Sequence, residues 1–332
     1  MPTLELSLGR YGRYNLASVP DFTVGALHQY VALTFCSAKR IHYGNSYVYQ
    51  GELQRGPDKP IDVVCKMTFN EDSDRLEDEA GFYSTQLKPL QDSAVPKFYG
   101  LFTGTYINSS GRNRAVRCIL LEPWGSPLQD IEACPMKLRI AIVEAVLRIH
   151  AAGVQHNDLC ESNILISADG REARLVDFDH ATKHRCMRRM RITLYSYPPL
   201  EADVQCEEVY EIASIMDIWP PRYVWIHGIK YSIHGCPTPT KFLELRGANT
   251  QGYTREQLLE EAEAVIGEYV REYGDRFRFI GEPGNPTDIA EPTDSELESD
   301  SESESVSEAK SDSHKIGYRA SDTKVHLLGR LQ

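Results

Sequence analysis

The stretch "VQHNDLCESNILISADGREARLVDFDHA", residues 154–181, contains two short apolar runs, "NILI" and "ARLV", with the turn sequence "ADG" between them. We interpret both runs as short strands. Asp158, Asn163 and Asp177 stand beside them. Carboxylate and amide oxygens are the ligands that Mg²⁺ prefers in proteins. The stretch therefore predicts a site that holds a metal-bound phosphate group.

The segments before this stretch predict strands followed by helices. "SYVYQGEL" and "IDVVCKM" are strand-like and are joined through "QRGPDKP", which indicates an antiparallel hairpin. We expect an acid-rich helix over about 71–88, then strands in "PKFYGLFTG" and "AVRCILLEP". "PMKLRIAIVEAVLRIHAAG" has the apolar spacing of a helix and a stop at Gly153.

Two further helices are expected after the stretch, at 206–219 and 253–274. The second begins with a capping box of Thr254 and Gln257. Its predicted apolar stripe consists of Leu258, Leu259, Ala262, Val265, Ile266, Tyr269 and Val270.

The two ends of the chain differ from its body. Residues 1–25 show no clear period and predict an irregular N-terminal arm, while the composition from about residue 283 predicts a disordered acidic tail. Ten acidic residues and one lysine between Asp288 and Asp312 carry −9 of the formal charge of −12, which leaves −3 for the rest. The body therefore lacks the basic surface that nucleic acid or an anionic membrane requires, and we expect neither as a partner.

Cysteine usage indicates reduced thiols in an intracellular protein. No signal peptide and no apolar run of about 18 residues is present, so we expect a soluble protein in the cytoplasm or nucleus. The chain has no CxxC pair and no metal-type spacing among Cys36, Cys65, Cys118, Cys134, Cys160, Cys186, Cys206 and Cys236.

The pattern HxDxxxxN, followed after the next two apolar runs by "DF", resembles the catalytic and metal loops of the protein-kinase-like superfamily. The resemblance implies that His156 belongs to the loop motif and that Asp158 is the catalytic base. It implies that Asn163 and Asp177 hold Mg²⁺. The segments "LEDEAGFY" and "LLEPWGSPL" are most similar to the divergent fungal-type kinase-like proteins.

The resemblance also implies ATP as the cofactor. By it, Lys66 contacts the nucleotide phosphates, and Glu79 on the following helix is its ion-pair partner, with Glu77 as a rival. "ILLEPWGSPL" is similar to the linker between kinase lobes, where Leu121 is the gatekeeper. The remaining nucleotide contacts fall on the backbone of Glu122 and Trp124 and on Val48, Gly44 and Leu165.

The chain departs from the family pattern at three places. Asp179 replaces the glycine of the DFG motif, and Asn157 replaces the arginine of HRD, which argues against activation by loop phosphorylation. The glycines expected in the Gly-rich loop are replaced by Ile41, Tyr43 and Ser46.

These features predict an α+β, two-lobed protein-kinase-like fold. The expected order is an N-terminal arm at 1–25, a small β-rich N-lobe with one helix at 26–122, a reduced helical C-lobe carrying the catalytic loop at 123–282, and a disordered tail at 283–332.

Three functions stay open at this point. The first is an ATP- and Mg²⁺-dependent phosphotransferase on a protein Ser/Thr hydroxyl. The second is a small-molecule kinase of the aminoglycoside or choline type, favoured by the reduced C-lobe. The third is a pseudokinase scaffold, suggested by the degraded Gly-rich loop. The basic segment "KHRCMRRMR", residues 183–191, is either a cationic loop for an anionic substrate or a solvated loop.

The tail generates a prediction of its own. Serines in "DSELESDSESESVSE" are followed by acidic residues, so acidophilic kinases should phosphorylate them and the tail should bind basic proteins. Mass spectrometry of the chain isolated from cells should find phosphate on these serines, and an unmodified tail would contradict the prediction.

Overall fold

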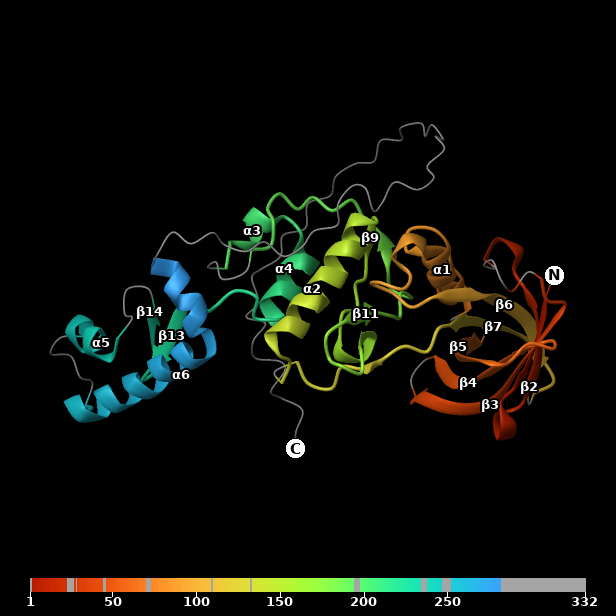
Figure 1. Ribbon diagram of the computed structural model, residues 1–332, viewed down its shortest axis with the longest axis horizontal. Coiled ribbons are helices and arrows are strands. Elements are labelled where there is room, and N and C mark those ends of the chain that lie inside the picture. Colours follow the sequence, from red (N-terminus) through yellow and green to blue (C-terminus); the bar gives the residue numbers. More distant parts are fainter. Residues whose placement is uncertain are drawn as a thin grey trace. The chain divides into compact units, whose positions relative to one another are not determined.

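The computed structural model describes residues 2–281 (Figure 1). It leaves out residues 23–26, 28, 44–45, 70–72, 109, 132, 194–197, 234–237 and 247–251. The tail predicted to be disordered, 283–332, lies outside the described residues.

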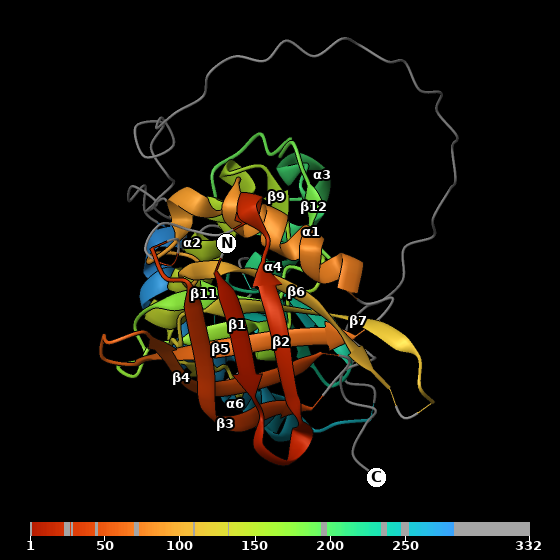
Figure 2. The same ribbon diagram turned by 90° about the vertical axis from the view of Figure 1, so that its right-hand side faces the viewer.

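Seven strands form a closed barrel in the order β1-β2-β6-β7-β5-β4-β3 (Figure 2). β1 closes it, because it pairs antiparallel with β2 and parallel with β3. The predicted hairpin is confirmed as β4 and β5, in which Val48 lies opposite Lys66. The strands are β1 Thr3–Ser7, β2 Arg13–Ser18, β3 Ala32–Tyr43, β4 Tyr47–Arg55, β5 Ile61–Phe69, β6 Phe98–Ile107 and β7 Asn113–Leu121.

The irregular arm predicted for residues 1–25 is wrong between Thr3 and Ser18, because β1 and β2 are regular strands of the barrel. Leu4, Leu6 and Leu8 are buried in its interior, and Glu5 between them is exposed. This alternation has the period of two that a strand with one buried face requires. It extends over only a few residues, which is why the pattern escaped the sequence analysis.

The helices follow the predicted positions closely. Those expected at 71–88, 206–219 and 253–274 are confirmed as α1, α4 and α6, with shifted ends. α1 packs on β5, β6 and β7 (Figure 2). The α-helices are α1 Ser73–Ser84, α2 Met136–Ala151, α3 Glu201–Val204, α4 Glu207–Ile215, α5 Pro239–Arg246 and α6 Arg255–Gly281.

Short strands follow the barrel along the chain. β10 pairs with β8 and β11, β12 pairs with β9, and β13 pairs with β14. Their bounds are β8 Ser126–Pro127, β9 Val154–Gln155, β10 Ile164–Ile166, β11 Ala173–Leu175, β12 Thr182–Lys183, β13 Tyr223–Ile226 and β14 Ile229–Ser232.

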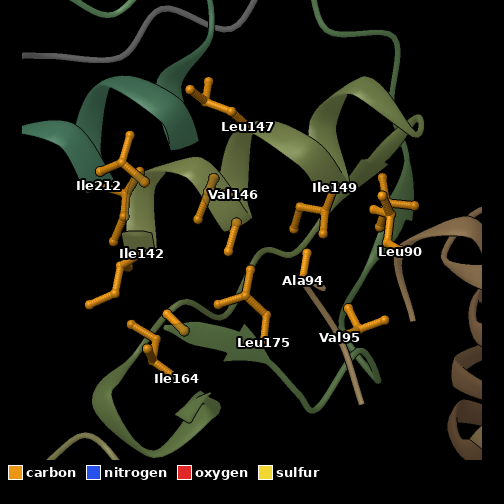
Figure 3. Close-up of a cluster of buried hydrophobic side chains, with 14 of the residues drawn as sticks. Leu90, Ala94, Val95, Ile142, Val146, Leu147, Ile149, Ile164, Leu175 and Ile212 are labelled. Atoms are coloured by element: carbon orange, nitrogen blue, oxygen red, sulfur yellow. The ribbon is translucent and has the colours of Figure 1, made fainter. Parts of the chain in front are cut away.

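α2 is the centre of a core that supports the region of the predicted catalytic loop (Figure 3). Its side chains Ile142, Val146 and Ile149 are buried with Ile164 of β10 and Leu175 of β11. The two strands between the predicted catalytic-loop and metal-loop sequences are therefore fixed against one helix.

α6 begins with the predicted capping box. The Thr254 N–H donates to Gln257 Oε1 at 2.9 Å, and the Gln257 N–H donates to Thr254 Oγ1 at 3.2 Å. The predicted stripe is buried at Leu258, Ala262, Ile266 and Tyr269 in a cluster shared with β13 and α5. The prediction was wrong for the last residue of the stripe, because Val270 is 44% exposed. No helix in the described ranges has the length and apolar content needed to cross a membrane.

The burial of β1 predicts that these first residues contribute to stability. Leu6→Ala should lower the free energy of unfolding by about 2–5 kcal/mol, because it opens a cavity in the barrel. Glu5→Ala, on the exposed face of the same strand, should change it by less than about 0.5 kcal/mol. Urea unfolding of both variants measures the difference. Equal small effects would mean that β1 does not close the barrel in solution.

Candidate active site

A buried ammonium group lies at the centre of the site. Lys66 on β5 is 5% exposed, and its Nζ lies 2.6 Å from Glu79 Oε2 on α1, which is fully buried. The rival Glu77 instead pairs with Arg117 at 3.1 Å. The structure therefore contains the predicted ion pair with Glu79.

Two aspartates of the DFD sequence complete the charge cluster. The Lys66 ammonium donates to Asp177 Oδ1, and Asp179 Oδ2 lies 3.9 Å from the same nitrogen. The Phe178 N–H donates to Glu79 Oε1 at 3.3 Å, which ties this loop to α1 as well. Three carboxylates thus surround one cation, and their full ionisation leaves an excess of two negative charges.

The pKa values reflect this balance. Burial lowers the pKa of Lys66, but the neighbouring carboxylates outweigh it and raise that pKa above its usual value. Burial also raises the pKa of Asp177, yet the Lys66 ammonium outweighs it and leaves the pKa of Asp177 below its usual value. Burial raises the pKa of Glu79, with Lys66 opposing the shift. Asp177 is therefore ionised at neutral pH, ready to bind a cation.

The backbone of the metal loop is unusual at one position. Asp177 has a φ of +69°, in the left-handed region that side chains other than glycine rarely adopt. Such conformations concentrate at functional sites, where the surrounding contacts hold them in place. Here the contact with Lys66 holds the Asp177 carboxylate toward the cavity.

The predicted catalytic loop is held by its own side chains. Asn163 Nδ2 donates to both the carbonyl and the carboxylate of Asp158, each at 2.9 Å, and Asp158 itself is exposed. His156 is fully buried, and its Nε2 lies 3.0 Å from the Val176 carbonyl next to Asp177. Burial lowers the pKa of His156. The neutral imidazole connects the two loops through its hydrogen bonds.

Glu208 at the start of α4 supports the same loop, and the sequence analysis missed it. Its carboxylate accepts the His156 N–H at 3.1 Å and the Asn157 N–H at 2.6 Å. Asn157 has a φ of +64°, so the loop turns sharply at this point. The signal available in the sequence was a pair of acidic residues in the first turn of the predicted helix, "CEEVYEIASI".

Most of the predicted site residues line one cavity of about 350 Å³. Val48 of β4 and Leu165 of β10 contribute apolar surface to it. Asp158 is not among the residues that line the cavity, and Gly44 lies outside the described residues. The other predicted residues in the lining are Lys66, Glu79, Leu121, Glu122, Trp124, Asn163 and Asp177.

One wall of the cavity is the linker after β7. The Glu122 N–H donates to the Lys97 carbonyl at 2.9 Å, and the Glu122 carboxylate pairs with Arg174 at 2.8 Å. The Arg174 guanidinium also lies over the Trp124 ring, 4.4 Å from its centre. Gly125 is required here, because a Cβ at this position would lie 2.3 Å from the Ile166 carbonyl oxygen. The linker is thereby fixed against β10.

The donor set fits Mg²⁺. Asn163 and Asp177 both line the cavity and each carries a side-chain oxygen, and the Asp179 carboxylate lies 3.9 Å from the Lys66 nitrogen. Mg²⁺ prefers oxygen ligands and is commonly bound by one or two carboxylates together with substrate phosphates. A divalent cation would also offset the excess negative charge around Lys66.

Residues 127–193 match the model of the lipopolysaccharide kinase (Kdo/WaaP) family. The family is protein-kinase-like, and the match, over about a fifth of the chain, includes Asp158, Asn163 and Asp177. It indicates a kinase-like phosphotransferase, and a kinase of this kind implies ATP and a hydroxyl acceptor. A comparison with curated proteins finds no match. The fungal-type resemblance stays a prediction.

The charge cluster predicts a strong effect on stability when its cation is removed. Lys66→Met should lower the free energy of unfolding by about 3–5 kcal/mol, because it leaves the buried Glu79 carboxylate without its cation. The exposed pair of Lys97 and Asp92 supplies the control. Lys97→Met should cost less than about 1 kcal/mol.

A double variant separates the charge effect from a packing effect. Lys66→Met combined with Glu79→Gln should recover part of the lost stability, because one buried charge is removed with its partner. Urea unfolding at constant pH measures all variants. Full additivity of the two substitutions would contradict a coupled cluster.

Proposed function

We propose that the chain is an ATP- and Mg²⁺-dependent phosphotransferase with a two-lobed, protein-kinase-like fold. The observation that carries the proposal is the contact of Lys66 with both Glu79 and Asp177. In protein kinases, a strand lysine pairs with a helix glutamate, and the aspartate of the metal loop must also be in place. Here all three groups meet at the wall of one cavity that the linker after β7 also borders.

The binding side of the proposal follows from the cavity. Lys66 would leave its contact with Asp177 and bind the nucleotide phosphates. Val48 and Leu165 would pack on the adenine. The Glu122 N–H already donates to the Lys97 carbonyl. Adenine would therefore donate a hydrogen bond to the carbonyl oxygen of Glu122. Asn163 and Asp177 would hold Mg²⁺, which when bound offsets the charge of the phosphates.

The chemical side of the proposal depends on Asp158. This carboxylate is exposed and is oriented by Asn163, so it can reach a hydroxyl group brought from solvent. As the base, it would accept the proton of that hydroxyl while the oxygen attacks the terminal phosphorus of ATP, whose bond to the bridging oxygen breaks and releases ADP. Asn163 would act as a positioning residue for Asp158 in addition to its role toward the metal.

Two classes of acceptor follow from different observations. The matched family model carries a lipopolysaccharide kinase name, which favours a sugar hydroxyl. The resemblance of the catalytic loop to protein kinases supports a Ser/Thr hydroxyl. We place the sugar or other small-molecule hydroxyl first, because the family match covers the catalytic loop itself.

Thermal unfolding tests nucleotide binding. ATP at about 100 times its dissociation constant should add about 2.7 kcal/mol of stability, seen as a rise in melting temperature that requires Mg²⁺ and is lost with EDTA. Asp177→Asn should abolish the shift. Asp62→Asn, an exposed residue on the strand that carries Lys66, should retain it. A native chain without any Mg²⁺-dependent shift would favour the pseudokinase scaffold.

The same preparations test the chemistry. Asp158→Asn should keep the ATP-dependent shift but lose about 10²–10⁴-fold in phosphate transfer, because only the base is removed. Transfer of labelled phosphate to sugar, small-molecule and Ser/Thr peptide pools identifies the acceptor class. Transfer by Asp158→Asn at the native rate would exclude Asp158 as the base.

A further inference from the structure

Two histidines and two cysteines converge behind the catalytic loop, away from the cavity. His150 lies in the last turn of α2, His184 and Cys186 follow β12, and Cys206 is the N-cap of α4. One side-chain donor atom from each lies within 4.8 Å of the other three. Three separate segments of the chain thus bring nitrogen and sulfur atoms to one point.

The spacing of these atoms suits a tetrahedral metal ion. Zinc bonds of about 2.3 Å to sulfur and 2.0–2.1 Å to nitrogen place neighbouring sulfur and nitrogen ligands roughly 3.6 Å apart. Cys206 Sγ lies 3.5 Å from His150 Nδ1 and 3.9 Å from His184 Nε2. The donor atoms are therefore close enough to one another to bind one ion without a rearrangement of the backbone.

The surroundings of His150 are those of a metal ligand. Its Nδ1 faces the sulfur atoms, and its Nε2 is hydrogen-bonded to the Glu208 carboxylate. Metal-bound histidines almost always donate their second ring N–H to a carboxylate, a carbonyl or water, which fixes the tautomer. His150 and Cys206 are buried, while His184 and Cys186 are half-buried, so an ion could enter from one side.

We propose that His150, His184, Cys186 and Cys206 bind one Zn²⁺ ion in a closed structural site. Thiolate and imidazole ligands favour zinc over Mg²⁺ or Ca²⁺, which require oxygen. Four protein ligands leave no open position for a reacting water, so the ion is structural and not catalytic. Cys186 and Cys206 would then be metal ligands, although the cysteine spacing along the chain showed no sign of a metal site.

The ion would connect α2 and α4 to the segment after β12. His184 and Cys186 lie within the basic segment 183–191, which the metal would fasten to α2 and α4. Glu208 joins the two sites, because one carboxylate bonds both His150 and the backbone of the catalytic loop. The metal site is independent of the proposed phosphotransfer and is tested without measuring it.

Metal content of the native full chain is the first test. The chain is purified without a histidine tag and without chelator, and zinc is measured by plasma mass spectrometry. We expect about one zinc ion per chain. Cys186→Ser and Cys206→Ser should each lose most of it. Cys36→Ser, a half-buried cysteine on β3 outside the cluster, is the matched control and should retain it.

Cobalt titration of the metal-free native chain gives a second readout that does not depend on whether the variants fold. Binding of one Co²⁺ should produce thiolate-to-metal charge-transfer absorption and the strong visible bands of a tetrahedral ion, and zinc should displace them. Less than about 0.1 zinc per chain together with no cobalt bands would overturn the proposal. So would a disulfide between Cys186 and Cys206 in peptides of the chain alkylated in its native state.

Discussion

The buried Lys66 ammonium is the interaction on which the rest of the site depends. An ammonium in the interior is tolerated only with carboxylates beside it. Glu79 comes from α1 and Asp177 from the loop after β11, so one cation joins the barrel, its packed helix and the metal loop. A shift of any one element changes the charge balance felt by the other two.

The loops around the cavity are fixed in the same manner, by polar side chains that reach from neighbouring elements. Asn163 orients Asp158, His156 bonds the carbonyl of the residue before Asp177, and Glu208 accepts two backbone N–H groups. Each of these three side chains has its hydrogen-bond partner, and such networks fix a unique geometry. These bonds support the loops from within the protein, while Asp158 itself stays exposed to solvent.

Sequence reasoning succeeded where the signal was local or part of a motif. The helices α2 and α6 have long apolar periods, and the resemblance named Glu79 ahead of Glu77 as the partner of Lys66. It failed where contacts join distant segments. The parallel pairing of β1 with β3 has no local signature, and His150 and Cys206 are far apart in the chain with no motif between them. Only the folded chain brings such residues together.

Closure of the barrel by β1 has a consequence for how molecules of this protein behave toward one another. A closed sheet has no unpaired edge, and unpaired edges are the templates on which β-proteins aggregate. Without β1 and β2, the facing edges of β3 and β6 would both be exposed. The first two strands, whose strand pattern in the sequence is short, thus protect the protein from edge-to-edge self-association.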